Sequence, residues 1–337
     1  MQCPKCGTVA PEGANFCEVD GTRLSPDSEA TVAVVSLPAV AVCRCGATAE
    51  SIDAQGYCQE CGRFCGPKER DHIEIVISSV FGGVTDRGKR HTQNEDDMAF
   101  SQIEEALPSG QTTQIIVVCD GVSSSEHAEM ASRTACLAAL SALDQQARTG
   151  FVEPEKAMVD AIRAANTAVC ALPQTHNSAK DPAETTIVAA VVKAGIATIG
   201  WVGDSRAYWF AELGAQQLTH DHSWINDVVD AGDMTEEEAS VAPGAHAITR
   251  CLGVAQAEDE DGSATQPTVI RFPLPGPGRL LLCSDGLWNY APHTADIATL
   301  LHQAPADADA VTLARTLVDF ANTQGGRDNI TVVIAQY

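Results

Sequence analysis

The stretch that decides the fold is TTQIIVVCDGVSSSEHAE, Thr112 to Glu129. Its apolar, β-type run from Ile115 to Val118 ends at Cys119 and then at the carboxylate of Asp120. A second apolar run, RLLLCSDGLWNY, ends in the same way at Asp285. Burial of a carboxylate without a partner of opposite charge costs several kcal/mol. The two segments therefore predict strands whose ends hold something positively charged.

The composition of the chain excludes several classes of partner. Its 337 residues include 45 Asp and Glu against 21 Lys and Arg, a formal net charge of −24. Such a charge disfavours nucleic acid and anionic membranes but tolerates divalent cations and basic protein segments. No stretch approaches the roughly 20 apolar residues that span a membrane. The N-terminal residues MQCPKCG lack the apolar core of a signal peptide. We therefore expect a cytoplasmic protein.

Cysteines are concentrated at the start of the chain, where eight of the thirteen lie within the first 65 residues. In a cytoplasmic protein they are more often metal ligands or buried thiols than disulfides. Units of this size bury too little apolar surface to be stable by that alone, so they need a bound metal or another cross-link. We predict a zinc ribbon at residues 1–25, a linker at 26–40, a second zinc ribbon at 41–68 and one large domain at 69–337.

Both small units resemble zinc ribbons, because each places pairs of ligands on tight, glycine-bearing turns. The candidate zinc ligands are Cys3, Cys6, Cys17 and Asp20 in the first unit, and Cys43, Cys45, Cys58 and Cys61 in the second. The first unit has two alternatives, a weakened zinc site or an aspartate-capped turn without metal. Neither unit has a basic, aromatic-interleaved face, so docking of a protein partner is favoured over nucleic-acid binding.

The large domain alternates strand-like and helical runs. The predicted strands are Ile73–Val80, Ile115–Asp120, Thr185–Val192, Ile196–Asp204, Arg206–Phe210, Arg279–Asp285 and Asn329–Gln336. The predicted helices are Glu126–Ala147, Glu153–Leu172, Ala295–His302 and Asp307–Asn322, and the Pro-rich Ser263–Gly278 is predicted to be a loop. Several strands follow one another with hairpin-sized gaps, which favours antiparallel sheets over a doubly wound parallel sheet.

Further carboxylates stand at the ends of predicted elements. Glu95, Asp96 and Asp97 lie in a predicted loop, Asp204 ends a strand beside Arg206, and Asp328 precedes the last strand. Each one alone is typical of a turn or loop residue, and Asp204 has the alternative of a plain ion pair with Arg206. Together they favour a hard divalent cation, which prefers oxygen ligands completed by water.

At this point the chain resembles a known family. The segments that carry the resemblance occur in the family's order and are RHTQNEDDMAF, VVCDGV, ETTIVAAVV, WVGDSRAYW, LTHDHS, ITRCLG, LLLCSDGLW and GGRDNITVVI. They resemble the metal-dependent serine/threonine protein phosphatases of type 2C, the PPM family, in its bacterial form. The resemblance implies an α+β fold, a four-layer αββα sandwich of two antiparallel sheets flanked by helices. It also implies two Mn²⁺ or Mg²⁺ ions at one end of the sandwich, with a possible third.

The resemblance also implies roles for individual residues. Asp120 is similar to the carboxylate that bridges the two ions, and the carbonyl of Gly121 to a further ligand. Asp285 and Asp328 look like ligands of one ion, and Glu95 or Asp96 like the acidic support of the other. Asp204 is similar to the residue that holds a weaker third ion. Asp96, Asp120, Asp285 and Asp328 are accordingly the expected catalytic set.

The implied reaction is hydrolysis of phosphoserine and phosphothreonine in proteins by a hydroxide that bridges the two ions, within reversible phosphorylation signalling. The substrates would be phosphoproteins made by Ser/Thr kinases. The phosphate-binding arginine of the family is replaced here by His91, with Arg90 beside it, and either residue could bind phosphate. The family's DGxGG reads DGVSS at residues 120–124. The alternative function is a catalytically weak phosphoprotein-binding module or scaffold.

Overall fold

The computed structural model describes residues 31–32, 51, 59–60, 68–104, 112–151, 153–173, 181–212, 214–245, 247–254, 265–305 and 307–337. Its strands are β1 Thr31–Val32, β2 His72–Ser78, β3 Phe81–Asp86, β4 Asp96–Glu104, β5 Thr112–Asp120, β6 Ile187–Lys193, β7 Ile196–Val202, β8 Arg206–Ala211, β9 Gly214–Gln217, β10 Thr268–Pro273, β11 Gly278–Cys283 and β12 Ile330–Gln336. Its helices are the short 3-10 helix η2 Lys68–Asp71, α1 Ala128–Thr149, α2 Pro154–Cys170, α3 Trp224–Asp230, α4 Glu236–Ser240, α5 Asp285–Trp288, α6 Thr294–Gln303 and α7 Ala310–Gln324.

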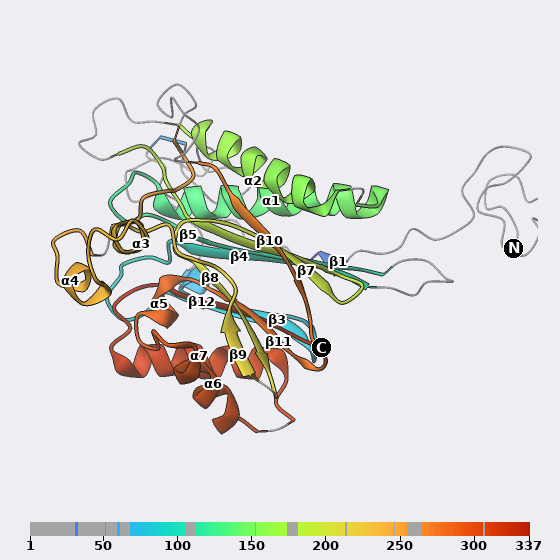
Figure 1. Cartoon of the computed structure of the whole chain (residues 1–337). Helices are drawn as coiled ribbons and strands as arrows, with labels where there is room; N and C mark the ends of the chain where they lie inside the picture. Colours follow the sequence, from blue (N-terminus) through green and yellow to red (C-terminus); the bar gives the residue numbers. More distant parts are fainter. Residues whose placement is uncertain are drawn as a thin grey trace, which may run out of the picture.

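The strands form two stacked sheets with helices on their outer faces (Figure 1). One sheet has the order β1-β4-β5-β6-β7-β10, and the other has the order β2-β3-β12-β11-β8-β9. Neighbouring strands pair antiparallel in both sheets. Helices α1 and α2 cover the first sheet, and α6 and α7 cover the second. The predicted four-layer αββα sandwich is therefore confirmed.

Three apolar layers hold the sandwich together. The layer between the sheets includes Phe81 and Phe100, whose ring centroids lie 5.1 Å apart and whose side chains are both fully buried. Alanines spaced four residues apart on α1, among them Ala131, Ala135 and Ala139, face the first sheet. Their small side chains let the helix lie close to the strands. Burial of the apolar side chains in these three layers holds the strands, and therefore their ends, in place.

The structure corrects several predicted elements. The segment around Asp96 was expected to be a loop, but Asp96 begins β4. The Pro-rich segment contains β10, which is an edge strand and tolerates a proline at its end, Pro273. Strand β3 was missed because its Gly82-Gly83 pair has low β propensity. A Cβ at Gly82 would lie 2.6 Å from the carbonyl oxygen of Ile75, so close strand approach requires the glycine.

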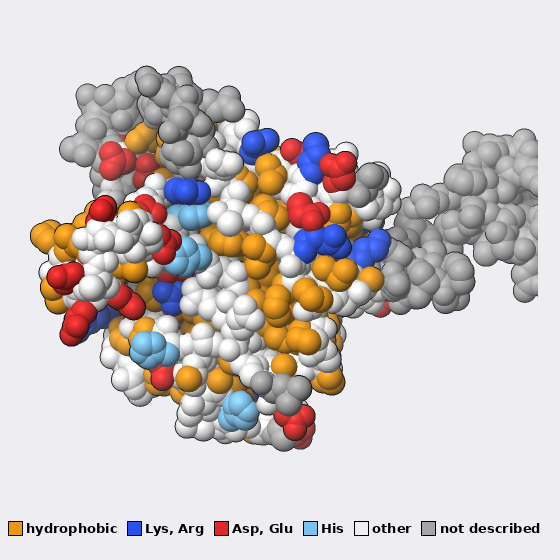
Figure 2. Space-filling view, in the orientation of Figure 1, with side chains coloured by type: hydrophobic (Ala, Val, Ile, Leu, Met, Phe, Trp, Pro, Cys, Tyr) orange, Lys and Arg blue, Asp and Glu red, His pale blue; other side chains and the backbone are white. Residues whose placement is uncertain are grey.

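The short helices α3 and α4 were also missed. They belong to a projecting segment on which acidic side chains gather (Figure 2). Its exposed acids are Asp227, Asp230, Asp233, Glu236, Glu237 and Glu238. The capping box of Thr235 and Glu238 starts α4, a signal that the sequence does contain. The four predicted helices are present, with their ends displaced by less than one turn.

The predicted zinc ligands lie outside the described residues. These are Cys3, Cys6, Cys17, Asp20, Cys43, Cys45, Cys58 and Cys61. The ribbons at 1–25 and 41–68 and the linker at 26–40 therefore stay predictions. Within the part of the chain that the structure describes, no helix is both long enough and apolar enough to cross a membrane.

Candidate active site

Strand register brings the predicted carboxylates to one end of the sandwich. Asp96 at the start of β4 lies opposite Asp120 at the end of β5. In the other sheet, Cys283 at the end of β11 lies opposite Arg206 at the start of β8. Asp285 and Asp204 lie just beyond these paired ends. Asp328 precedes β12, whose first residue pairs with β3. Residues far apart in sequence thus meet because antiparallel strands alternate their ends.

Asp96 is oriented by a chain of hydroxyl groups. The hydroxyls of Ser284 and Thr331 both donate to its Oδ2, at 2.6 and 2.7 Å. Because Thr331 donates to Asp96, the hydroxyl of Thr85, 2.7 Å away, must donate to Thr331. Thr85 in turn accepts from the side-chain amide of Asn94 at 2.9 Å. This relay saturates Oδ2 and leaves Oδ1 buried with no hydrogen-bond partner.

Asp285 shows the same division between its two oxygens. Its Oδ2 accepts from the side-chain amide of Asn289 at 3.0 Å, one helical turn later. Its Oδ1 is buried and has no hydrogen-bond partner. A buried carboxylate oxygen without a donor is costly unless a cation satisfies it. Asp96 and Asp285 therefore each present one oxygen that fits a metal ion.

Burial and mutual repulsion raise the pKa values of four carboxyl groups of this site. Burial, and then the charges of Asp96 and Asp285, raise the pKa of Asp120 well above its ordinary range. Burial and the charge of Asp204 do the same to the pKa of Asp285. Burial raises the pKa of Asp96 to about 7 despite its two hydrogen bonds. Burial and the charge of Asp221 raise the pKa of Asp204 to about 7.

The donor set suits a hard divalent cation. These side chains offer oxygen only, and bound cations are the natural counter-charge for carboxylates that repel one another. Among the described residues, no group of three or more His, Cys, Asp or Glu side chains has the arrangement of a complete metal site. The fit to a metal ion therefore rests on donor chemistry and on the two unpartnered oxygens.

Asp120 is held by backbone and hydroxyl contacts from the two threonines that directly precede β6. The amide of Thr186 and the hydroxyl of Thr185 donate to its carbonyl oxygen, both at 2.8 Å. The amide of Asp120 donates to the hydroxyl of Thr186 at 3.3 Å. Gly121 follows because a Cβ there would lie 2.4 Å from the carbonyl oxygen of Ala128. Any larger residue at position 121 would collide with the backbone at the start of α1. Neither threonine was predicted to be a site residue, although both belong to ETTIVAAVV, a segment that carries the family resemblance.

Glu95 and His91 lie on the loop that leads into β4. Asn329 accepts from the amide of Glu95 at 2.8 Å and so ties this loop to the start of β12. The Nε2 atom of His91 lies 3.2 Å from Asp328 Oδ1, and its Nδ1 lies 3.7 Å from Glu95 Oε2. Glu95 raises the pKa of His91 against the opposing effect of burial, and Asp328 adds to the rise. His91 is thus held between two predicted metal-site carboxylates.

Arg90 and Ser123 complete this side of the site. The side chain of Arg90 is exposed. Ser123, which stands in the departure from the family's DGxGG, donates its hydroxyl to Glu95 Oε2. Burial opposes ionisation of Glu95, but hydrogen bonds from His91, Ser123 and Gln93 bring its pKa below the ordinary value. The hydroxyl of Ser123 therefore helps to hold the Glu95 carboxylate in place.

The ion pair considered for Asp204 is wrong. Arg206 instead grips Asp221, with Nη2 2.6 Å and Nε 3.0 Å from Oδ2. Its guanidinium also lies 3.8 Å from the ring centroid of Trp288. The indole of Trp288 donates to the carbonyl oxygen of Asp204 at 3.0 Å. Arg206 therefore shapes the site around Asp204 without neutralising it, and Asp221 is a residue that the sequence did not single out.

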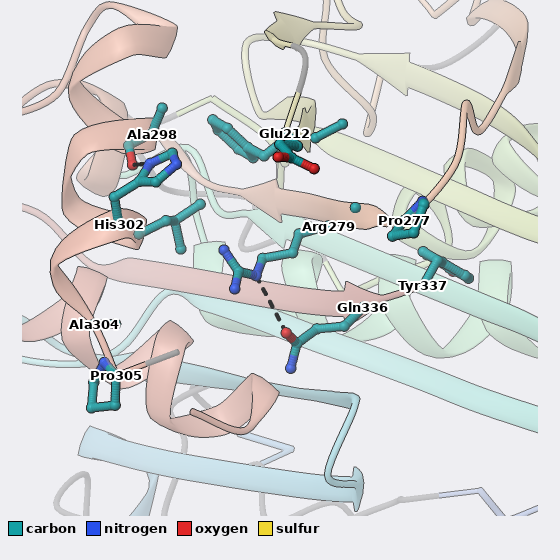
Figure 3. Close-up of a pocket in the computed structure, with 13 residues that line it drawn as sticks. Glu212, Pro277, Arg279, Ala298, His302, Ala304, Pro305, Gln336 and Tyr337 are labelled. Carbon is teal, nitrogen blue, oxygen red and sulfur yellow. Dashed lines mark hydrogen bonds between the residues drawn. The ribbon is translucent and has the colours of Figure 1, made fainter. Parts of the chain in front are cut away.

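A hollow of about 440 Å³ lies at the opposite end of the second sheet (Figure 3). It opens between α6 and the far ends of β8, β11 and β12. Arg279 lies in it and donates from Nε to Gln336 at 3.3 Å. Arg279 pairs with Phe210, four residues along each strand from the pair of Cys283 and Arg206. This hollow is therefore separate from the carboxylate site.

Comparison with known proteins agrees with this fold. The family model for protein phosphatase 2C matches residues 87–321. The serine/threonine phosphatase stp of Listeria welshimeri is 29% identical over 255 residues, which cover 75% of this chain and 93% of that protein. Protein phosphatase PhpP of Streptococcus pneumoniae is 38% identical over 135 residues, 40% of this chain and 50% of that protein.

Solved structures give the same picture. The serine/threonine phosphatase of S. agalactiae has a TM-score of 0.62 at 27% identity, covering 78% of this chain and 98% of that one. The catalytic domain of phosphatase PstP in complex with two manganese ions has a TM-score of 0.58 at 28% identity, covering 76% and 96%. Fold and site define a two-sheet sandwich with buried carboxylates gathered at one end. The chain belongs to the protein phosphatase 2C family.

The raised pKa values predict an unusual pH dependence of stability. A carboxyl whose pKa rises from 3.8 to about 7 on folding, as for Asp204, keeps protons that the unfolded chain has released. The metal-free protein should therefore lose stability as pH rises from about 4 to about 7. We expect Tm in chelator, measured by calorimetry across this window, to fall less steeply for Asp204→Asn than for the wild type. Glu236→Gln, at an exposed position, should keep the wild-type slope. Equal slopes for all three proteins would contradict the prediction.

Proposed function

We propose that this chain is a metal-dependent phosphatase that hydrolyses phosphoserine and phosphothreonine in proteins. The observation that carries this proposal is the group of mutually repelling carboxylates at one end of a type 2C fold, two of which present unpartnered buried oxygens. Membership of the family and the manganese-bound relative support it. The substrates would be proteins phosphorylated by Ser/Thr kinases.

Asp120, Asp285 and Asp328 would hold the two Mn²⁺ or Mg²⁺ ions, together with the carbonyl of Gly121. Asp96 and Glu95 would support the ions from the loop and start of β4. When bound, such ions lower the pKa of a coordinated water and neutralise charge on a phosphate. The side chains of the site then have a positioning task. The hydroxyl relay fixes Asp96, and the threonine contacts fix the backbone of Asp120.

The two cysteines beside the metal-site aspartates, Cys119 and Cys283, are not suited to act as nucleophiles. Cys119 and Cys283 directly precede the metal-site segments, but both are fully buried. Burial raises the pKa of each thiol, which keeps it protonated and unreactive at neutral pH. These thiols therefore do not supply the nucleophile, and we assign that role to water from solvent. This agrees with a hydrolase that forms no covalent intermediate with the protein.

Substitution of the ligands tests the assignment. Asp120→Ala, Asp285→Ala and Asp328→Ala should each reduce hydrolysis of para-nitrophenyl phosphate and of a phosphothreonine peptide to background, and should weaken Mn²⁺ binding measured by calorimetry. Asp204→Ala should lose only a weak Mn²⁺ site, because we assign it to the third ion. Asp319→Ala, on the exposed face of α7, is the control. Wild-type turnover in any of the first three would remove that residue from the site. A wild type that binds a phosphopeptide but turns over neither substrate would favour the scaffold alternative.

His91 is the better candidate for phosphate binding. It faces Asp328, whereas the side chain of Arg90 is exposed. A partly protonated imidazole offers one or two donors, fewer than the fork of an arginine.

We expect His91→Ala to raise KM for a phosphopeptide in steady-state assays, and His91→Arg to keep KM near the wild-type value. Arg90→Ala should leave KM unchanged. A large rise in KM for Arg90→Ala, with His91→Ala near the wild type, would transfer the role to Arg90.

The cysteine pairs at the start of the chain are proposed to hold structural Zn²⁺ independently of catalysis. Thiolates select zinc, whereas the carboxylates of the large domain select Mn²⁺ or Mg²⁺. The ribbons would then be free to dock a protein partner.

A fragment starting near Glu69 should hydrolyse para-nitrophenyl phosphate with Mn²⁺ as fast as the full chain does. The full chain, but not the fragment, should contain zinc by elemental analysis, and Cys58→Ser with Cys61→Ser should remove the zinc of the second ribbon. A folded but inactive fragment would show that the ribbons complete the active site.

A further inference from the structure

Arg70 reaches the metal site from outside the part of the chain that matches the family. It lies in η2, whereas the family match begins at residue 87. Its side chain is only 7% exposed, and its Nη2 lies 2.6 Å from Asp97 Oδ2. The same nitrogen lies 3.4 Å from the carbonyl oxygen of Asp96. A buried arginine is thus bound to the two aspartates that begin β4.

The backbone around Arg70 is attached to the same loop. The side-chain amide of Asn94 donates to the carbonyl oxygen of Arg70 at 3.3 Å. The amide of Arg87 donates to the carbonyl oxygen of Asp71 at 2.7 Å, and Arg87 Nε lies 3.1 Å from Asp71 Oδ2. Helix η2 therefore contacts both the start and the end of the loop that carries His91 and Glu95.

Asp96 and Asp97 are chemically identical neighbours that point in different directions. Successive side chains of a strand point to opposite faces of the sheet. Asp96 turns toward Ser284 and Thr331 of the second sheet. The Oδ1 of Asp97 accepts from the amide of Met98 at 2.8 Å, while its Oδ2 accepts from Arg70. A slip of one residue in β4 would exchange the two carboxylates at this end of the sandwich.

We propose that Arg70 is a positioning residue of the metal centre. It binds Asp97 and so prevents this carboxylate from competing with Asp96 for the place beside Asp120. This inference rests on the proposed function, because it assumes that Asp96 faces a divalent cation. One nitrogen of Arg70 serves both contacts, since Nη2 binds the Asp97 carboxylate and also lies near the carbonyl oxygen of Asp96.

Mn²⁺ binding to the full-length chain, measured by titration calorimetry, tests the proposal without reference to turnover. We expect Arg70→Gln to weaken Mn²⁺ binding by about tenfold or more, the scale for residues that support metal ligands from behind. The double variant Arg70→Gln/Asp97→Asn should recover wild-type affinity, because the competing carboxylate is gone. Arg315→Gln is the matched control. It breaks another arginine–carboxylate ion pair, in which Arg315 Nε and Nη2 lie 2.5 and 2.6 Å from the two oxygens of Glu74 on β2.

Each outcome separates positioning from structural support. Wild-type Mn²⁺ affinity in Arg70→Gln, with only a lower Tm, would overturn the proposal. Failure of the double variant to recover would overturn it as well. If circular dichroism shows that Arg70→Gln does not fold, the single variant Asp97→Asn decides. Wild-type Mn²⁺ affinity in Asp97→Asn supports the proposal. Loss of tight Mn²⁺ binding in Asp97→Asn instead makes Asp97 itself a ligand. A wild type that binds no Mn²⁺ would instead refute the proposed function.

Discussion

Repulsion among carboxylates at one end of the sandwich is the constraint on which the rest of the structure depends. Asp96, Asp120, Asp204 and Asp285 all have raised pKa values, and each owes part of the rise to the charge of another carboxylate. Such a group opposes folding unless surrounding interactions compensate it. The three apolar layers supply that compensation, because they bury the strands on whose ends the carboxylates stand.

Polar neighbours of the site decide which carboxylate oxygens stay available. The hydroxyls of Ser284 and Thr331 occupy one oxygen of Asp96, and Asn289 occupies one oxygen of Asp285. The other oxygen of each is left for a cation. A carboxylate with hydrogen bonds to both oxygens would serve only to hold the structure together. A carboxylate with one oxygen left without a donor can also act as a ligand. The relay through Thr85 and Thr331 therefore links the packing of the sheets to the chemistry of the site.

The basic side chains near the site are also held by specific partners. Arg206 is held by Asp221 and Trp288, and Arg70 is held by Asp97, so neither neutralises the central carboxylates. The imidazole of His91 lies between Glu95 and Asp328. Positive charge thus lies around the edge of the site, and the central carboxylates keep their negative charge available for a proposed metal ion. The strong acidity of the chain as a whole is consistent with this arrangement.

The sequence by itself determined the strands that lead to Asp120, Asp204 and Asp285 and the strand that follows Asp328. Apolar runs that end at Asp120 and Asp285 predicted strands with a charged partner at their ends, and antiparallel sheets followed from the short connections. These features are local, because β propensity and hydrophobic pattern act over a few residues. Only the tertiary structure decided that β4 begins at Asp96 and that a strand lies in the Pro-rich segment. It alone decided the ion pairs too, joining Arg70 to Asp97 across 27 residues and Arg206 to Asp221 in place of Asp204. The physical reason is that an arginine binds the carboxylate that packing brings within reach, and that choice depends on how all the layers come together.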